Sequence, residues 1–308
     1  RVSENRNGDP GDGDSGLDPG PPYGGVAVAI SADGCVVAFQ SAASNLDPDR
    51  EDTNGVRDIF VWDCQTQATT LVSVNLGGVA GNGASFNPSV SADGRLVTFA
   101  SDADDLVGDD GNFARDFFVH EFGIHRTTRV SVASDGGDAN NGSSYIGISA
   151  AAISADGRYV AFDSLATNLV EGDTNPGGWN IFVRDRQEQR TTRVSPGPQG
   201  TPGFSYEPDI SADGRRVAFV SLANDAPDAF VYDREQGIIW WSEGTAYAAP
   251  EPAISADGRH VAFVSNANGV VVHDLQTEQT TPVSNAPNGS PPNGGAGQPV
   301  ISGDGRHV

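Results

Sequence analysis

The chain has 308 residues, with 18 arginines, no lysine and 41 acidic residues, which give a formal net charge of −23 at pH 7. A chain this acidic repels nucleic acids and anionic membranes, so neither is an expected partner. No segment is apolar over the length that a membrane span requires.

The tetrapeptide Ser-Ala-Asp-Gly recurs along the chain, with its Asp-Gly steps 44 to 63 residues apart. The copies begin at Ser31, Ser91, Ser154, Ser211, Ser255 and, as Ser-Gly-Asp-Gly, at Ser302. A repeat of this size indicates one supersecondary unit that has been copied, with the copies burying their faces on one another.

Each copy is expected to supply four short strands. In the first copy a short strand leads into Ser31, and residues 36–39, 59–63 and 69–73 form the second, third and fourth strands. These runs are rich in Val, Ile, Phe and Thr, which is typical of strands. Asp-Gly between two such runs predicts a tight hairpin, because glycine accepts the positive φ of the turn.

Matching runs follow in chain order in the later copies. They are residues 96–99, 117–121 and 127–131, then 159–162, 181–185 and 191–195, then 216–219 and 229–233, then 260–263, 270–274 and 280–284. Trp240-Trp241 departs from the repeat where the fourth strand of its copy should lie. Such aromatic residues are expected to fill space at a blade edge; the alternative is that they bind a sugar ring or a partner protein. No stretch has convincing helical periodicity.

The unit Ser-Ala-Asp-Gly-Arg-x-Val-Ala-Phe resembles the WD-like repeat of the TolB-like six-bladed β-propellers, and the resemblance covers nearly the whole chain. It implies an all-β fold of four-stranded antiparallel blades within a single domain, 1–308. We expect blades at about 23–77, 84–134, 148–197, 206–244 and 250–286, with an incomplete sixth blade from 298–308 plus 1–5. The chain is therefore expected to be a fragment of a longer protein.

Both cysteines depart from the repeat. Cys35 stands where the other complete copies have arginine, and Cys64 directly follows the third strand. If Phe39 pairs with Phe60 in the hairpin of the second and third strands, Cys35 lies beside Cys64. We predict a disulfide, and with it an extracellular or periplasmic protein; the alternative is two free thiols.

The loop between the second and third strands is rich in Asp and Asn in three copies. The candidate ligands are Asp52, Asn54 and Asp58, then Asp110, Asn112 and Asp116, then Asp173 and Asn175. Oxygen side chains at alternating positions are what calcium requires. The alternative is that these residues form turns by bonding their own backbone, without an ion.

No residue set indicates a reaction. A Gly-x-Ser-x-Gly elbow is absent from the sequence, and the histidines do not converge on a metal site. An acidic residue at the end of the third strand and an arginine after Asp-Gly recur in nearly every copy, which indicates structural ion pairs. The first strands offer mainly small and apolar residues. We therefore expect a protein that is not an enzyme.

In a four-stranded blade, the connections from second to third strand and from fourth strand to the next blade leave the same face. Both sets are long here, and variable loops on a rigid scaffold are where binding usually resides. We expect a secreted, non-catalytic binding or scaffold module that meets a protein or polysaccharide through this face and is stabilised by calcium. The alternatives are a carbohydrate-active lyase or hydrolase that uses the central channel, and the propeller appendage of a larger hydrolase.

Overall fold

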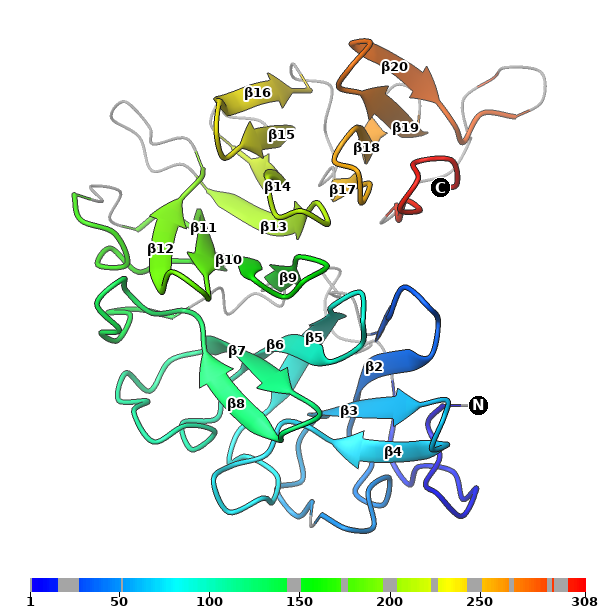
Figure 1. The fold of residues 1–308 in the computed structure, drawn as a ribbon, viewed down its shortest axis with the longest axis vertical. Coiled ribbons are helices and arrows are strands. Elements are labelled where there is room, and N and C mark those ends of the chain that lie inside the picture. Colours follow the sequence, from blue (N-terminus) through cyan, green and yellow to red (C-terminus); the bar gives the residue numbers. More distant parts are fainter. Residues whose placement is uncertain are drawn as a thin grey trace.

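Five four-stranded antiparallel sheets are arranged around a common centre in the computed structural model (Figure 1). The structure describes all residues except 1, 16–27, 51, 143–150, 173–176, 196–203, 223–226, 243–250, 266–268, 287–289 and 291–298. The described residues contain no helix, and so none that is long and apolar enough to cross a membrane. The prediction of an all-β propeller of four-stranded antiparallel blades is confirmed.

Each blade runs from its inner to its outer strand in chain order. Blade 1 contains β1 (Val28–Ile30), β2 (Val36–Ser41), β3 (Asp58–Asp63) and β4 (Ala68–Leu71). Blade 2 contains β5 (Ser85–Val90), β6 (Leu96–Ser101), β7 (Asp116–Glu121) and β8 (Arg126–Arg129). Blade 3 contains β9 (Ala151–Ile153), β10 (Tyr159–Ser164), β11 (Asn180–Asp185) and β12 (Arg190–Arg193). Blade 4 contains β13 (Ser205–Ile210), β14 (Arg216–Ser221), β15 (Asp228–Asp233) and β16 (Gly237–Trp241), and blade 5 contains β17 (Ala253–Ile254), β18 (His260–Ser265), β19 (Gly269–Asp274) and β20 (Gln279–Pro282).

Trp240-Trp241, where the sequence departs from the repeat, lies within a strand. These residues end β16, which pairs with β15 through a register shift between Val231 and Tyr232. The indole of Trp240 stacks on the His273 ring of blade 5 at a centroid distance of 4.3 Å. The unusual sequence thus fills the space between two blades without breaking the strand.

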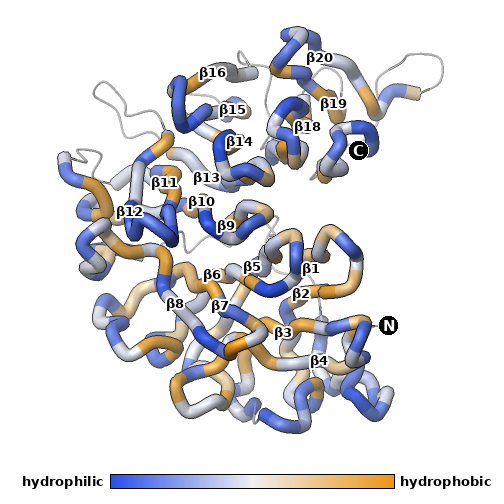
Figure 2. Tube along the Cα trace, viewed as in Figure 1, coloured by the Kyte–Doolittle hydropathy of each residue, from blue (hydrophilic) through white to orange (hydrophobic). Residues whose placement is uncertain are grey.

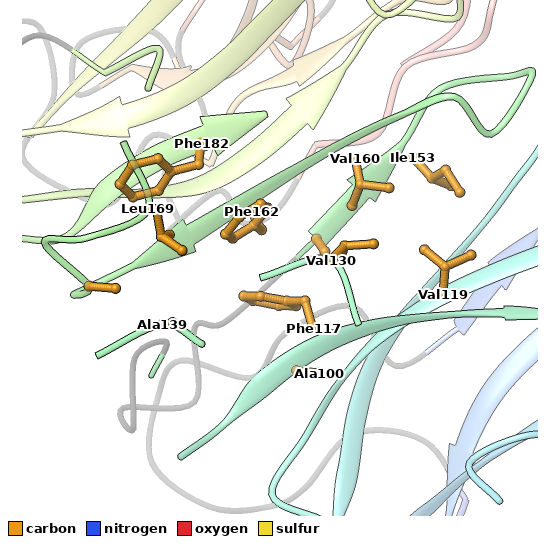
Figure 3. Packing of buried hydrophobic residues seen from close by; sticks show 12 residues of the cluster. Ala100, Phe117, Val119, Val130, Ala139, Ile153, Val160, Phe162, Leu169 and Phe182 are labelled. Carbon is orange, nitrogen blue, oxygen red and sulfur yellow. The ribbon is translucent and has the colours of Figure 1, made fainter. Parts of the chain in front are cut away.

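The core lies between neighbouring blades, because the middle strands are covered on both faces. Figure 2 shows hydrophobic tube along the middle strands and hydrophilic tube along outer strands such as β8 and β12. Between blades 2 and 3, Phe117 of β7 faces Phe162 of β10 at 5.7 Å, and Phe162 stacks on Phe182 of β11 at 5.8 Å (Figure 3). All three rings are fully buried, and each contributes roughly 1.5–3 kcal/mol of apolar burial.

The Ser-x-Asp-Gly turn satisfies its own polar groups. In blade 3 the Ser154 hydroxyl donates to Asp156 Oδ1 at 2.6 Å and accepts the Tyr159 N–H at 3.0 Å. Asp156 Oδ1 also accepts the Arg158 N–H at 2.9 Å. The Ala155 N–H is left free to cross to the next blade, where it donates to the Ala212 carbonyl at 3.0 Å.

This crossing hydrogen bond repeats around the propeller. The other donor and acceptor pairs are Ala32 with Ala92, Ala92 with Ala155, and Ala212 with Ala256, at 2.9–3.1 Å. The sixth copy has the same internal turn bonds, with Ser302 donating to Asp304 Oδ1 at 2.7 Å. A Cβ at Gly303 would lie 3.2 Å from Ala256, so this turn packs on blade 5 as the others pack on their neighbours. The number of six blades stays a prediction.

Both the backbone conformation and the packing of the neighbouring blade require glycine in this turn. Gly157 has φ +70°, and a Cβ there would overlap the side chain of Leu96 in blade 2. Gly94, Gly214 and Gly305 stand against Val36, Tyr159 and His260 in the same way. The glycine therefore sets how closely one blade approaches the blade before it.

Comparison of Gly157→Ala with Gly136→Ala separates the two requirements. Gly136 also has positive φ, at +86°, but a Cβ there would meet nothing within 4 Å. We expect Gly136→Ala to lower the free energy of unfolding by about 1 kcal/mol from φ alone, and Gly157→Ala to lower it by about 1–3 kcal/mol more from overpacking. Urea unfolding followed by tryptophan fluorescence measures both, and equal losses would contradict the packing argument.

Candidate functional site

The long connections emerge on one side of the blades, which we call the loop face. It comprises the described parts of the second-to-third-strand loops, of which those after β2, β6 and β10 are the longest, and of the connections between blades, such as 72–84 and 130–142. The opposite side, the turn face, comprises the Ser-x-Asp-Gly turns and the short turns between third and fourth strands.

Reciprocal hydrogen bonds clasp the two sets of loops together. In blade 2, the Asn82 N–H donates to Asp105 Oδ1 at 2.9 Å, and the Asp104 N–H donates back to Asn82 Oδ1 at 3.0 Å. Asn140 and Thr167 form the corresponding clasp in blade 3, where the Thr167 N–H donates to Asn140 Oδ1 at 2.9 Å. These clasps, which the sequence does not reveal, cross-link the described loops of blades 2 and 3.

The first candidate loop forms a turn through its own side chains. Asn54 Oδ1 accepts the Val56 N–H at 2.9 Å, and its amide donates to Asp58 Oδ2 at 2.7 Å and to the Gly81 carbonyl at 2.8 Å. Asp58 is fully buried, and burial raises its pKa to about 7. Asp52 is nearly buried, and burial followed by the charge of Asp12 raises its pKa as well.

The second candidate loop holds an arginine between its carboxylates. Arg129 Nη1 lies 2.7 Å from Asp110 Oδ1 and 3.4 Å from Asp116 Oδ2, and its Nη2 pairs with Asp138. Burial nevertheless raises the pKa of Asp110 to about 6. Blade 1 has Leu71 where blade 2 has Arg129. The positive charge that neutralises the carboxylates of the second loop is therefore replaced by an apolar side chain in the first.

The last carboxylate of each loop has a structural contact in its own blade. Asp58 Oδ1 accepts the Ser73 hydroxyl at 2.6 Å, and that hydroxyl accepts the Ile59 N–H at 2.9 Å. Ser131 with Asp116, Ser195 with Asn180, and Ser242 with Asp228 repeat the arrangement. The side chain at this position thus ties the start of the third strand to the end of the fourth, in blades with and without the predicted calcium pattern.

Asp173 and Asn175, the candidates in the third loop, lie outside the described residues. Among the residues that are described, no group of three or more His, Cys, Asp or Glu side chains is arranged to hold a metal ion. The contacts of Asn54 and Asn112 are those of turns closed by side chains, because Asn112 Oδ1 accepts the Ala114 N–H at 3.0 Å just as Asn54 does in blade 1. Calcium binding stays a prediction.

Cys35 and Cys64 form a disulfide, with their Cα atoms 4.9 Å apart. Phe39 pairs with Phe60 as the hairpin argument requires, and the Cys64 N–H donates to the Cys35 carbonyl at 2.9 Å. In the other blades this end of the hairpin is closed by an arginine and a carboxylate. The pairs are Arg95 with Glu121, Arg158 with Asp185, Arg215 with Asp233 and Arg259 with Asp274, at 2.6–3.4 Å.

Sequence reasoning missed a carboxylate group near the inner strands. Glu207 lies at a bulge in β13 with φ +53°, and its Oε2 is buried without a hydrogen-bond partner. Burial, with the charges of Glu251 and Asp163, raises the pKa of Glu207 to about 8. The available signal was a polar residue before proline: Glu207-Pro208 and Glu251-Pro252 match Asn87-Pro88, and all three polar residues have positive φ.

Comparison with known proteins gives neighbours among propellers. TolB from Acinetobacter baumannii matches with a TM-score of 0.51 and 18% identity over 83% of this chain and 53% of that chain. A prolyl endopeptidase structure matches with a TM-score of 0.53 and 12% identity over 86% of this chain and 35% of that one. Dipeptidyl peptidase 4 of Porphyromonas gingivalis matches with a TM-score of 0.50 and 16% identity over 80% of this chain and 37% of that one.

The fold is that of a TolB-like β-propeller. No family model and no curated protein matches the chain. It spans about half of the TolB chain and about a third of each peptidase chain. At these identities the likeness concerns the fold alone, and it assigns no role to the candidate residues of this TolB-like propeller.

Replacement of Glu207 by glutamine tests the inner carboxylate. Because the pKa of Glu207 is raised in the folded state, its contribution to stability is complete below about pH 4.5 and is lost as pH rises to about 8. Glutamine does not ionise, so Glu207→Gln should be more stable than the wild type at pH 8 by at least about 2 kcal/mol, with a far smaller difference at pH 4.

The matched control is Glu278→Gln, because Glu278 is exposed and the corresponding positions of blades 1 and 3 hold Gln67 and Gln189. Urea unfolding of the three proteins between pH 4 and pH 8 gives the comparison. If Glu207→Gln and Glu278→Gln show the same pH dependence, the Glu207 carboxyl is solvated in the folded protein.

Proposed function

We propose that this TolB-like propeller is a secreted, non-catalytic binding module that engages a protein partner through the loop face. The asymmetry of the two faces carries the proposal. The turn face repeats one short turn from blade to blade, whereas the loop sequences differ from blade to blade. Among the described loops, those of blades 2 and 3 are tied together by side-chain hydrogen bonds such as that of Asn82 with Asp105. Rigid, variable loops are the usual place of binding on a scaffold.

The disulfide supports export from the cytoplasm. Cys35 and Cys64 are the only cysteines of the chain, and both are in the bond. Structural disulfides persist in oxidising compartments and are rare in the cytosol of most organisms. The net charge of −23 favours a basic partner over an acidic one.

Calcium remains part of the proposal, and the first loop is its best place. Burial raises the pKa of both Asp52 and Asp58 there, to about 7 for Asp58, and Leu71 takes the position that the Arg129 guanidinium has in blade 2. A divalent cation would favour the ionised form of these carboxylates and use oxygen ligands of the kind calcium prefers.

An enzyme is the second candidate, and the inner carboxylates are the observation that favours it. A glutamate with its pKa raised to about 8, beside Asp163 and Glu251, has the protonation state of a general acid at neutral pH. The same register shift occurs at Asn87 in β5, where no glutamate is present, so the bulge has a structural explanation. Binding through the loop face is therefore the first proposal.

Selection of ligands against both faces tests the proposed function. We expect immobilised protein to enrich peptides from a displayed library. Loop-face substitutions such as Phe204→Ser, at a partly exposed ring directly before β13, should reduce their binding. Turn-face substitutions such as Gln65→Ala and Gln187→Ala should leave binding unchanged, because those turns repeat one shape in every blade. Peptides that respond only to the turn-face variants, or enrichment of glycans in place of peptides on an array, would overturn the proposal.

A thermal unfolding experiment at constant ionic strength tests calcium. An ion that binds only the folded state stabilises it by about 2.7 kcal/mol at a hundredfold excess over its Kd. Calcium should therefore raise the Tm of the wild type, and Asp52→Ala should remove that response. Asp110→Ala is the control, since Asp110 is paired with Arg129 and its loss should leave the calcium response in place. If calcium does not change the Tm of the wild type, the loops are closed by their own hydrogen bonds alone.

A further inference from the structure

Phe113 occupies a backbone conformation that suits glycine. It has φ +52°, and its side chain is 80% exposed at the tip of the blade 2 loop. The corresponding positions of blades 1 and 3 hold Gly55 at φ +70° and Gly177 at φ +86°. A bulky residue is strained in this region, and a ring that stays in solvent gains almost no burial to offset that strain.

The turn beneath Phe113 is firmly held. The Asn112 amide donates to the Ala139 carbonyl at 3.2 Å, and its Oδ1 accepts the Ala114 N–H at 3.0 Å. Arg115 pairs with both oxygens of Asp102, at 2.7 and 2.9 Å, and its guanidinium lies 4.7 Å from the centre of the Phe86 ring. The ring of Phe113 is therefore presented from a fixed support.

A second exposed apolar residue borders the same loop. Leu76 is 77% exposed in the turn that connects blades 1 and 2, and a Cβ added at Gly108 would lie 3.6 Å from Leu76 Cδ1. Its turn is tied to the loop by the Asn75 amide, which donates to Asp105 Oδ2 at 3.0 Å. The exposed Asp109 follows Gly108 toward Phe113. We call Leu76, Asp109 and Phe113 the blade 2 rim.

Single exposed apolar residues are common and do not by themselves indicate a binding site. Phe113 differs because the fold accepts glycine at its position in two other blades, so nothing in the blade requires the ring. Strain at a well-supported position is the kind of outlier from which a functional role is inferred.

We propose that the blade 2 rim binds an extended protein segment in which an arginine or lysine stands beside an apolar residue. The apolar residue would lie against Leu76 and Phe113, while the cation would meet the Asp109 carboxylate and the face of the aromatic ring. The chain's net charge of −23 attracts such a segment at long range. This inference rests on the proposed function, because the rim is part of the loop face.

The polar groups near Phe113 favour a basic peptide over a sugar. Asn112 and Asn140 use both ends of their amides internally, the latter on Thr167 at 2.9 Å from each atom. The exposed carboxylates of Asp109 and Asp135 accept hydrogen bonds and donate none, and therefore suit cationic donors.

The experiment uses the whole chain and a library of displayed 12-residue peptides as the probe. We expect the enriched peptides to contain an excess of Arg and Lys beside apolar residues. Fluorescein-labelled copies of these peptides are then titrated against four proteins: wild type, Phe113→Gly, Asp109→Asn and Ile124→Gly. Ile124 is the matched control, since it is 59% exposed on the turn face of the same blade.

Phe113→Gly should raise the Kd at least about tenfold, and Asp109→Asn should raise it about two- to fivefold, an effect that shrinks with added salt. Ile124→Gly should leave the Kd unchanged. The Tm of Phe113→Gly should equal or exceed that of the wild type, because glycine relieves the positive φ. A structural role for Phe113 would instead lower the Tm.

Three results would overturn the inference: enriched peptides without basic residues, an unchanged Kd for Phe113→Gly, or a Phe113→Gly variant with a clearly lower Tm. Peptides that bind the loop face and respond to Phe204→Ser but not to Phe113→Gly would overturn the inference and leave the proposed function intact. Peptides that respond only to Ile124→Gly, Gln65→Ala or Gln187→Ala would overturn both.

Discussion

The hydrogen bond that crosses from one Ser-x-Asp-Gly turn to the next is the constraint on which the other features of the propeller depend. Each Ala N–H, as in Ala155 to the Ala212 carbonyl at 3.0 Å, fixes the height of one blade against its neighbour. The glycine that follows fixes the distance, because the preceding blade occupies the place where a Cβ would stand. The serine and aspartate side chains hold the turn closed by hydrogen bonds within it, which leaves the Ala N–H for the contact between blades. With inner ends held this way, the aromatic layers between blades come into register, and the loops on the opposite side reach fixed positions.

The repeat made much of this architecture predictable, because the same physical requirement appears in the sequence several times. Strand type follows from short Val- and Phe-rich runs, and the hairpin from Asp-Gly. The Cys35–Cys64 bond follows from register alone, since an antiparallel pair that matches Phe39 with Phe60 also matches the two cysteines. The departure from the repeat at Trp240 was less informative. Sequence shows that the pattern changes there, but not that a bulge and a stack on His273 can absorb the change.

The candidate site was harder to predict because one residue type serves several purposes. Asp58 and Asp116 fit a calcium loop by spacing, yet each accepts the hydroxyl that closes its own blade, Ser73 or Ser131. The spacing of residues within a loop also does not reveal side chains that reach the loop from a distant strand. Arg129 enters the second loop from β8, fourteen positions beyond the loop's own Arg115 in the chain. The bulge that buries Glu207 is likewise a product of how β13 pairs with β14, and the sequence marks it only by a following proline.

Departures from the repeat therefore separate into two kinds according to what surrounds them. Some are compensated within the blade: the disulfide closes the hairpin end where blade 1 has cysteine in place of arginine, and Trp240 fills a gap between blades. Phe113 has no such compensation, since its ring is 80% exposed on a backbone that favours glycine. In a chain whose repeated positions are already explained by packing and turn geometry, a departure that costs stability without repairing any contact of the fold is the one that binding best explains. The same reasoning ranks the blade 2 rim above the first acidic loop, where the buried Asp58 retains a structural bond to Ser73 whether or not an ion is present.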